Sequence, residues 1–117
     1  MTPTKEKIKV ADLIITAFEG GSNYWLRKAQ LVDSTNQPVE RPWYADEALY
    51  EADFNIRLEE HGDYDALYLT RNRLIRGQKI LKTEFPWVWE RLVDESYDAE
   101  DADTFLQFCL FGELVYG

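Results

Sequence analysis

The sequence has few of the residues with which small proteins most often build cross-links, metal sites or nucleophiles. Among 117 residues it has one cysteine, Cys109, and one histidine, His61. A single cysteine excludes an intramolecular disulfide, and no second histidine or cysteine stands at the spacing of a zinc site. Because Cys109 lies within the apolar run 105–111, we expect a buried thiol instead of a reactive one. The sequence therefore predicts no metal and no cofactor, and it indicates no catalytic residue.

Long apolar runs and an excess of positive charge are also missing. No stretch approaches the ~18 apolar residues of a membrane-spanning helix, and no apolar region of the secretory kind follows the charges of residues 1–7. We expect a cytoplasmic protein that does not associate with membranes. The 13 basic residues are outnumbered by 22 acidic ones, which gives a formal net charge of −9. This balance disfavours direct binding to nucleic acid or anionic lipid, and it favours a basic partner.

What the sequence does contain is enough apolar and aromatic material for the core of one domain over residues 1–117. Hydrophobic residues make up 45% of the chain and aromatic residues 15%. This is the balance of a globular protein, and the length needs no disulfide or metal for stability. Any large aromatic side chain left outside the core is a candidate contact for a partner.

The first half of the chain predicts a helix followed by a strand. Apolar residues recur with helical spacing over residues 10–18, with Thr4 as a candidate cap and the Gly20–Gly21 pair as the stop. Residues 24–32 alternate as a partly buried strand does, and residues 33–38 form a polar loop. Residues 44–52 fit either irregular structure or a short helix.

The second half predicts a β-hairpin over residues 54–69 and then helices. Thr70 is a candidate cap for a helix over residues 71–85, in which Gly77 suggests a close helix crossing. Pro86 ends that helix or begins the next, and Asp98 or Asp101 caps a last helix that ends at Gly112. The expected fold class is α+β: an N-terminal helix, a small antiparallel sheet of about three strands, then C-terminal helices.

The most unusual string is residues 19–25, in which two glycines stand among polar and aromatic residues. Such a string allows a backbone to approach a ligand, with aromatic rings to stack on it. The alternative is a helix stop, a turn and a strand start, and this structural interpretation is the simpler one. The candidate binding residues are Glu19, Gly20, Gly21, Asn23, Tyr24 and Trp25.

A second candidate is the acidic stretch 94–103, which lacks the glycine and final glutamate of a calcium loop. It fits a face that imitates the charge of nucleic acid, or a solvated helix start with capping carboxylates, which we favour. Its candidate binding residues are Asp98, Asp101 and Asp103. The basic residues of 71–82 are expected to form a solvated face paired with acidic segments.

Two strings of the sequence resemble those of a family of small proteins encoded by phages, prophages and other mobile elements. They are AFEGGSNYW at residues 17–25, and DAEDAD at residues 98–103 followed by Gln107 and LFGELVYG at residues 110–117. Between them Leu69, Thr70, Leu74 and Gly77 are also similar, whereas residues 33–52 do not match. The resemblance implies an accessory protein that acts in a bacterial host cell. It brings no established activity and no catalytic residue with it.

Three functions are compatible with these features. The preferred hypothesis is a non-enzymatic protein that binds a host or phage protein, one form of which is an acidic inhibitor of a nucleic-acid-binding protein. The second is a protein that sequesters a small molecule at residues 20–25. The third is a small enzyme with carboxylate chemistry, using Glu19, His61 or the carboxylates of residues 98–103.

Overall fold

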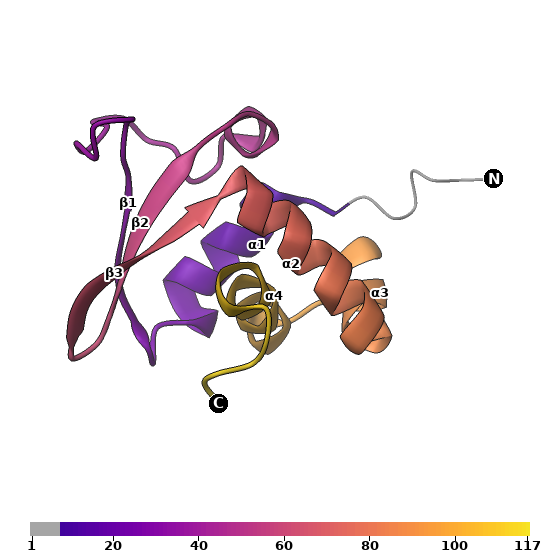
Figure 1. Cartoon of the computed structure of the whole chain (residues 1–117). Helices are drawn as coiled ribbons and strands as arrows, with labels where there is room; N and C mark the ends of the chain where they lie inside the picture. Colours follow the sequence, from indigo (N-terminus) through magenta and orange to yellow (C-terminus); the bar gives the residue numbers. More distant parts are fainter. Residues whose placement is uncertain (1–7) are drawn as a thin grey trace.

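The computed structural model describes residues 8–117, apart from the side chains of residues 63 and 64, and it confirms the α+β class (Figure 1). The helical elements are α1 (Val10–Thr16), the π-helix η2 (Ala17–Gly21), the 3-10 helix η3 (Glu47–Glu51), α2 (Arg71–Glu84), α3 (Pro86–Val93) and α4 (Ala99–Phe111). The strands are β1 (Leu26–Leu31), β2 (Asn55–Glu60) and β3 (Asp63–Thr70). The candidate cap Thr4 lies outside the described residues.

The three strands form one antiparallel sheet in the order β1-β2-β3. The predicted hairpin is β2 and β3, and Gly62 in its turn has a φ of +76°, which glycine adopts without strain. Ile56 and Leu58 are fully buried, as is Leu69 on β3, whereas the residues that alternate with them on β2 are half-buried. The sheet therefore has one face in the core, as the alternation predicted.

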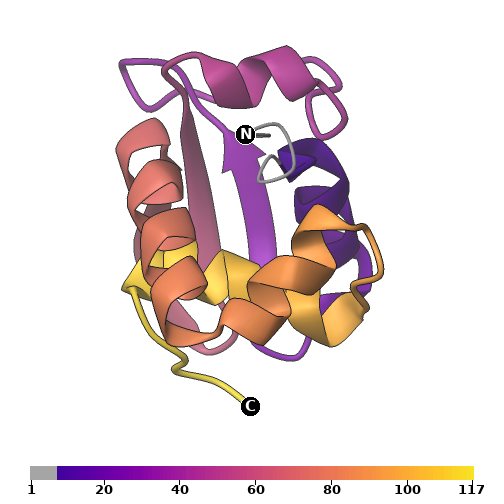
Figure 2. The same cartoon turned by 90° about the vertical axis from the view of Figure 1, so that its right-hand side faces the viewer.

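The helices cover that face of the sheet. All four α-helices lie on one side of the strands (Figure 1), and seen from that side α2 and α3 lie in front of them (Figure 2). Phe105 and Leu106 of α4 are fully buried together with Leu13 and Ile14 of α1. The core thus lies between the sheet and the helices, with α4 running through its centre.

Local signals place the helix ends where the sequence predicted. The Thr70 hydroxyl accepts a hydrogen bond from the Arg73 backbone N–H at 3.3 Å, and Pro86 is the first residue of α3. Asp98 caps α4 in a capping box with Asp101, and Gly112 closes the helix with a φ of +76°. Each of these signals acts within one helical turn, so it needs no tertiary contact to be effective.

Gly77 is where α2 and α4 cross closely, as expected. A Cβ atom at this position would lie 2.5 Å from the Cα of Cys109 and 2.7 Å from its backbone nitrogen. Cys109 is itself fully buried, and burial raises the pKa of its thiol far above the ordinary range. The predicted unreactive thiol is therefore confirmed.

Two expectations for the first half of the chain need correction. Gly20 and Gly21 do not end a helix in the left-handed conformation, because α1 continues directly into η2 through both glycines. The strand is also shorter than predicted, and its pairing shifts between Leu26 and Lys28, so the alternation is interrupted. The ambiguous segment 44–52 contains the short helix η3.

The basic residues of α2 also differ from expectation. Arg71 and Arg73 donate hydrogen bonds to the backbone carbonyls of Tyr50 and Tyr68. They therefore fasten α2 to η3 and β3, and this role replaces the expected pairing with acidic segments for these two residues. No helix among the described residues has the length and apolar character needed to cross a membrane.

Replacing Gly77 by alanine tests the close crossing. The new methyl group meets backbone atoms of α4, which cannot rotate away, so the two helices must separate. Overpacking costs about 1–3 kcal/mol, against a gain of roughly 1 kcal/mol in helix propensity. We expect Gly77→Ala to lower the free energy of unfolding by a net of about 1 kcal/mol in urea denaturation.

Gly20→Ala is the matched control, because no atom lies within 4 Å of a Cβ at that position. It should change the free energy of unfolding by no more than about 0.5 kcal/mol. Equal stability of the two variants would refute the close crossing.

Candidate binding groove

The two strings singled out in the sequence meet in the structure. The end of η2 lies against the first turn of α4, and a Cβ atom at Gly21 would overlap the carbonyl oxygen of Ala99. Only glycine permits this approach without displacement of the backbone. Gly21 is therefore needed for a tertiary contact and not for a helix stop.

A buried carboxylate joins the same two segments. Asp103 of α4 is only 5% exposed, and one of its oxygens accepts hydrogen bonds from the Ser22 hydroxyl at 2.7 Å and the Trp25 indole N–H at 2.8 Å. The other oxygen accepts from the Tyr24 hydroxyl at 2.6 Å and the Gln107 side-chain amide at 3.0 Å. Four neutral donors thus replace the water that the carboxylate loses on burial.

Gln107 extends this network to the C-terminal segment 113–117. Its side-chain oxygen accepts hydrogen bonds from the backbone N–H groups of Val115 and Tyr116 at 2.8 and 2.9 Å. The Tyr116 ring stacks on Trp25, with centroids 4.9 Å apart and planes 5° from parallel. The segment is therefore held on two sides, by a fully buried glutamine and by an aromatic stack.

The surroundings of Tyr24 change its acidity. Partial burial of its hydroxyl, the hydrogen bond to Asp103 and the negative charges of Asp103 and Glu100 together raise the pKa of the Tyr24 phenol to about 12. The neutral phenol is the form that donates to Asp103. Tyr24 therefore remains a hydrogen-bond donor throughout the neutral pH range.

On the other side of α4, an ion pair joins α3 to the first turn of α4. The Arg91 guanidinium donates two hydrogen bonds to Asp101, at 2.6 and 2.7 Å. Arg91 lowers the pKa of Asp101, although burial of the carboxyl opposes the shift, and the same bonds raise the pKa of Arg91. Because Asp101 also belongs to the capping box, one carboxylate fixes both the start of α4 and its distance from α3.

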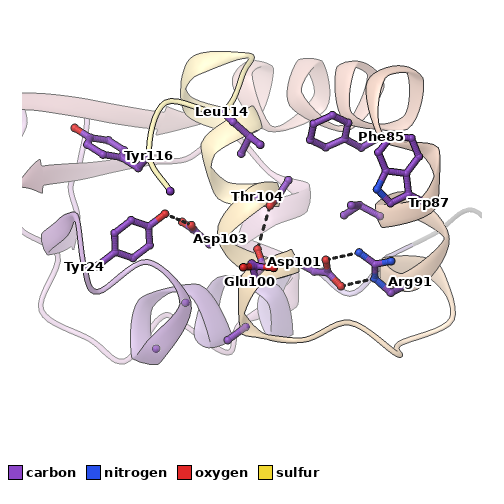
Figure 3. Close-up of a pocket in the computed structure, with 15 residues that line it drawn as sticks. Tyr24, Phe85, Trp87, Arg91, Glu100, Asp101, Asp103, Thr104, Leu114 and Tyr116 are labelled. Atoms are coloured by element: carbon purple, nitrogen blue, oxygen red, sulfur yellow. Dashed lines mark hydrogen bonds and ion pairs between the residues drawn. The ribbon is translucent and has the colours of Figure 1, made fainter.

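These contacts surround a groove of about 560 Å³, which lies between η2, α3, the first turns of α4 and the C-terminal segment (Figure 3). Tyr24 and Trp87 lie toward its opposite ends, and Glu100 and Thr104 lie between them. Tyr24 and Trp87 are each 55% exposed, and Leu114 is 44% exposed. The groove thus presents exposed apolar surface on a floor that is fixed by buried hydrogen bonds.

The sequence-predicted residues fall into two groups. Those that line the groove are Gly20, Gly21, Tyr24, Asp101 and Asp103. Trp25 is buried beneath it, and Asp98 caps α4. Glu19 and Asn23 are exposed but do not line the groove, and the Asn23 carbonyl lies 3.0 Å from the His61 ring.

One prediction about the acidic stretch was wrong. Asp101 and Asp103 were expected on a solvated helix start, but both are 5% exposed. The reason is that η2 and α3 pack on either side of the first turns of α4, and that the turn 22–25 after η2 and Arg91 of α3 supply the donors that burial requires. Glu100, between these two residues in the sequence, remains exposed.

Sequence reasoning missed other residues of the groove. Phe85, Trp87, Arg91, Leu114 and Tyr116 line the groove, and Ser22 and Gln107 belong to the buried network around Asp103. A polar residue inside the apolar run 105–111 was a usable signal for Gln107, because a buried amide requires partners. Nothing local marks Arg91 or the exposure of Trp87, whereas Trp43 and Trp89 are buried.

The described part of the chain gives no support to metal chemistry or to a shared set of catalytic groups. It contains no cluster of three or more His, Cys, Asp or Glu side chains that could hold a metal ion. Neither Glu19 nor His61 lines the groove with the carboxylates of α4. Of the groups proposed for an enzyme, only those carboxylates lie together.

Comparison of the chain with models of protein families, with curated proteins and with solved structures gives no match. The resemblance to mobile-element proteins therefore stays a prediction, and the function is argued from the geometry of the groove.

Replacing Asp103 by asparagine tests the buried network. The new NH2 group faces donors where the carboxylate presented an acceptor, and an unsatisfied buried donor costs about 1–3 kcal/mol. We expect Asp103→Asn to lower the free energy of unfolding by about 2 kcal/mol, measured by urea denaturation at pH 7. Asp53→Asn removes the same charge from an exposed loop residue and should be nearly neutral. Equal effects of the two variants would show that charge alone matters.

The raised pKa of Tyr24 predicts a loss of stability at alkaline pH. Between the ordinary phenol pKa of 10 and the folded value of about 12, the unfolded chain releases this proton while the folded chain keeps it. The contribution of Tyr24 to the free energy of unfolding should therefore be complete below pH 10 and fall as the pH rises toward 12. In urea denaturation at pH 8 and pH 11, Tyr24→Phe should lose less stability than the wild type. Part of the loss should persist, because burial also raises the pKa of Tyr50. The same loss in both proteins would contradict the assignment.

Proposed function

We propose that this protein is a non-enzymatic accessory protein of a phage or other mobile element, and that it binds a host or phage protein in the groove. The observation that carries the proposal is the exposure of Tyr24, Trp87 and Leu114 around a floor held by buried hydrogen bonds. Aromatic side chains on a rigid support are typical of the residues that dominate binding energy at protein interfaces. The resemblance to mobile-element proteins supplies the expected setting.

The rigidity of the floor supports binding for an energetic reason. A partner loses less binding energy when the surface that it meets is already ordered. Asp103 and Gln107 of α4 hold the turn 22–25 between η2 and β1 and the C-terminal segment with hydrogen bonds that are present before any partner arrives. Trp87 is supported as well, because its ring stacks on Phe85 with centroids 5.2 Å apart.

A second candidate function is the sequestration of a small molecule. The groove volume of about 560 Å³ lies within the range of roughly 300–1,000 Å³ for ligand pockets. Native mass spectrometry of freshly purified protein distinguishes the two candidates, because a sequestered ligand adds mass to the folded protein. A clean mass of the chain alone from several expression hosts favours the protein partner.

The proposed function is tested in two steps, in which the partner is first captured and its affinity for variants of the groove is then measured. A tagged wild-type protein captures its partner from a lysate of phage-infected host cells, and binding of the purified partner is then measured by calorimetry. Trp87→Ala should raise the dissociation constant by about 30-fold, which corresponds to the ~2 kcal/mol of a central interface aromatic. The folded state should be unaffected, because the indole is mostly exposed.

Ile75→Ala is the matched control for this measurement. Ile75 is an exposed apolar residue of α2 outside the groove, at 37% exposure. Its replacement should leave the dissociation constant unchanged. A partner whose affinity is equally affected by both variants, or by neither, binds elsewhere, and the proposed function of the groove would then be wrong.

A further inference from the structure

The charges that line the groove are unbalanced. Three carboxylates line it, those of Glu100, Asp101 and Asp103, against the single guanidinium of Arg91. Arg91 is already bound to Asp101 through two hydrogen bonds. Among the described residues that line the groove, Asp103 and Glu100 are therefore left without a cationic partner.

Asp103 accepts hydrogen bonds at both of its carboxylate oxygens, but no positive charge among the described residues neutralises it. Its donors are a hydroxyl, a phenol, an indole and an amide, all of which are neutral. They solvate the carboxylate and leave its negative charge at the floor of the groove. Glu100 is exposed above that floor, and none of the described basic side chains pairs with it. Both carboxylates line the groove, and the negative charge of each raises the pKa of Tyr24.

The same space has aromatic and aliphatic walls. Trp87 and Tyr24 lie toward the two ends of the groove, with Glu100 between them, and Leu114 lies on the C-terminal segment above (Figure 3). Aromatic faces attract cations, with Trp the strongest and Arg the most frequent partner. The aliphatic stems of long basic side chains also pack well on apolar surface. Carboxylate and ring together therefore match a long side chain with a positive end.

An anionic occupant does not fit this arrangement. A phosphate or carboxylate ligand needs a cation, and the only guanidinium of the groove is committed to Asp101. A second copy of the chain is the main competing occupant, because α2 carries the exposed basic residues Arg76 and Lys79. That alternative makes a different prediction for the oligomeric state.

We propose that the groove binds an arginine- or lysine-bearing segment of the partner protein, with the cation beside Glu100 and the side chain packed against Trp87. This inference rests on the proposed function and specifies the chemistry of its partner. The basic side chain replaces solvent over the two carboxylates, while its stem covers aromatic surface. Arginine is the better of the two occupants, because its planar guanidinium both stacks on a ring and bonds a carboxylate.

The test uses a defined probe, N-acetyl-argininamide, with N-acetyl-citrullinamide as its neutral counterpart of nearly the same shape. Binding is followed by 1H–15N NMR spectra of the labelled protein up to about 20 mM probe, since a dissociation constant of 1 mM corresponds to roughly −4 kcal/mol. We expect saturable shifts of the Trp87 indole signal and of the Glu100 and Thr104 amides with the arginine derivative only. The indole signal is assigned from the spectrum of Trp87→Phe.

Two charge-matched variants decide whether the site is specific. Glu100→Gln should weaken binding of the arginine derivative at least about threefold, on the scale of an exposed charge pair. Glu90→Gln removes the same charge from an exposed residue of α3 that does not line the groove, and it should leave binding unchanged. Equal weakening by both variants, equal shifts with the citrulline derivative, or no shifts at all would overturn the inference.

Failure of this inference and failure of the proposed function have different signatures. If Trp87→Ala weakens binding of the captured partner but Glu100→Gln does not, the groove binds a protein without a basic side chain at Glu100. Only the inference is then wrong. If neither substitution changes the dissociation constant of the partner, the proposed function of the groove is wrong as well. Sedimentation that shows a concentration-dependent oligomer, lost in Glu100→Gln, would assign the groove to a second copy of this chain and overturn the inference.

Discussion

The burial of one carboxylate, that of Asp103, determines how the two halves of this chain meet. A carboxylate is strongly destabilised away from water unless donors surround it, and here those donors come from the turn 22–25 between η2 and β1 and from α4 itself. Ser22, Tyr24 and Trp25 lie 78 to 81 residues away in the sequence. The same constraint orders the C-terminal segment through Gln107, so the groove has a defined floor on one side.

The second constraint is the close approach of two elements to α4, which requires glycine at two positions. Gly21 lets η2 reach the first turn of the helix, and Gly77 lets α2 cross it at Cys109. Between these two contacts, α4 is buried along most of its length. The Arg91–Asp101 ion pair adds α3 to the same first turn. The groove exists because η2 and α3 converge on the start of α4, with the C-terminal segment beside them, without filling the space between them.

The distribution of aromatic residues and charge follows from this arrangement. Three of the four tryptophans are buried, and the fourth, Trp87, stays exposed because α3 directs it over the groove and not into the core. Among the described residues, the only basic side chain that lines the groove is that of Arg91, and it is already bound to Asp101. The surface that remains for a partner is therefore aromatic and negative, a combination that favours cationic side chains over phosphate groups.

The sequence by itself determined the features that act over a few residues. The β-hairpin followed from alternation, the caps at Thr70 and Asp98 from side-chain chemistry within one turn, and the close crossing from a glycine inside a helix. It also indicated the two strings that meet in the groove. Only the tertiary structure decided that Gly21 serves a contact and not a stop, that Asp101 and Asp103 are buried, and that Arg91 and Trp87 join them. Local patterns cannot report donors some 80 residues distant, and burial of a charge depends on those donors.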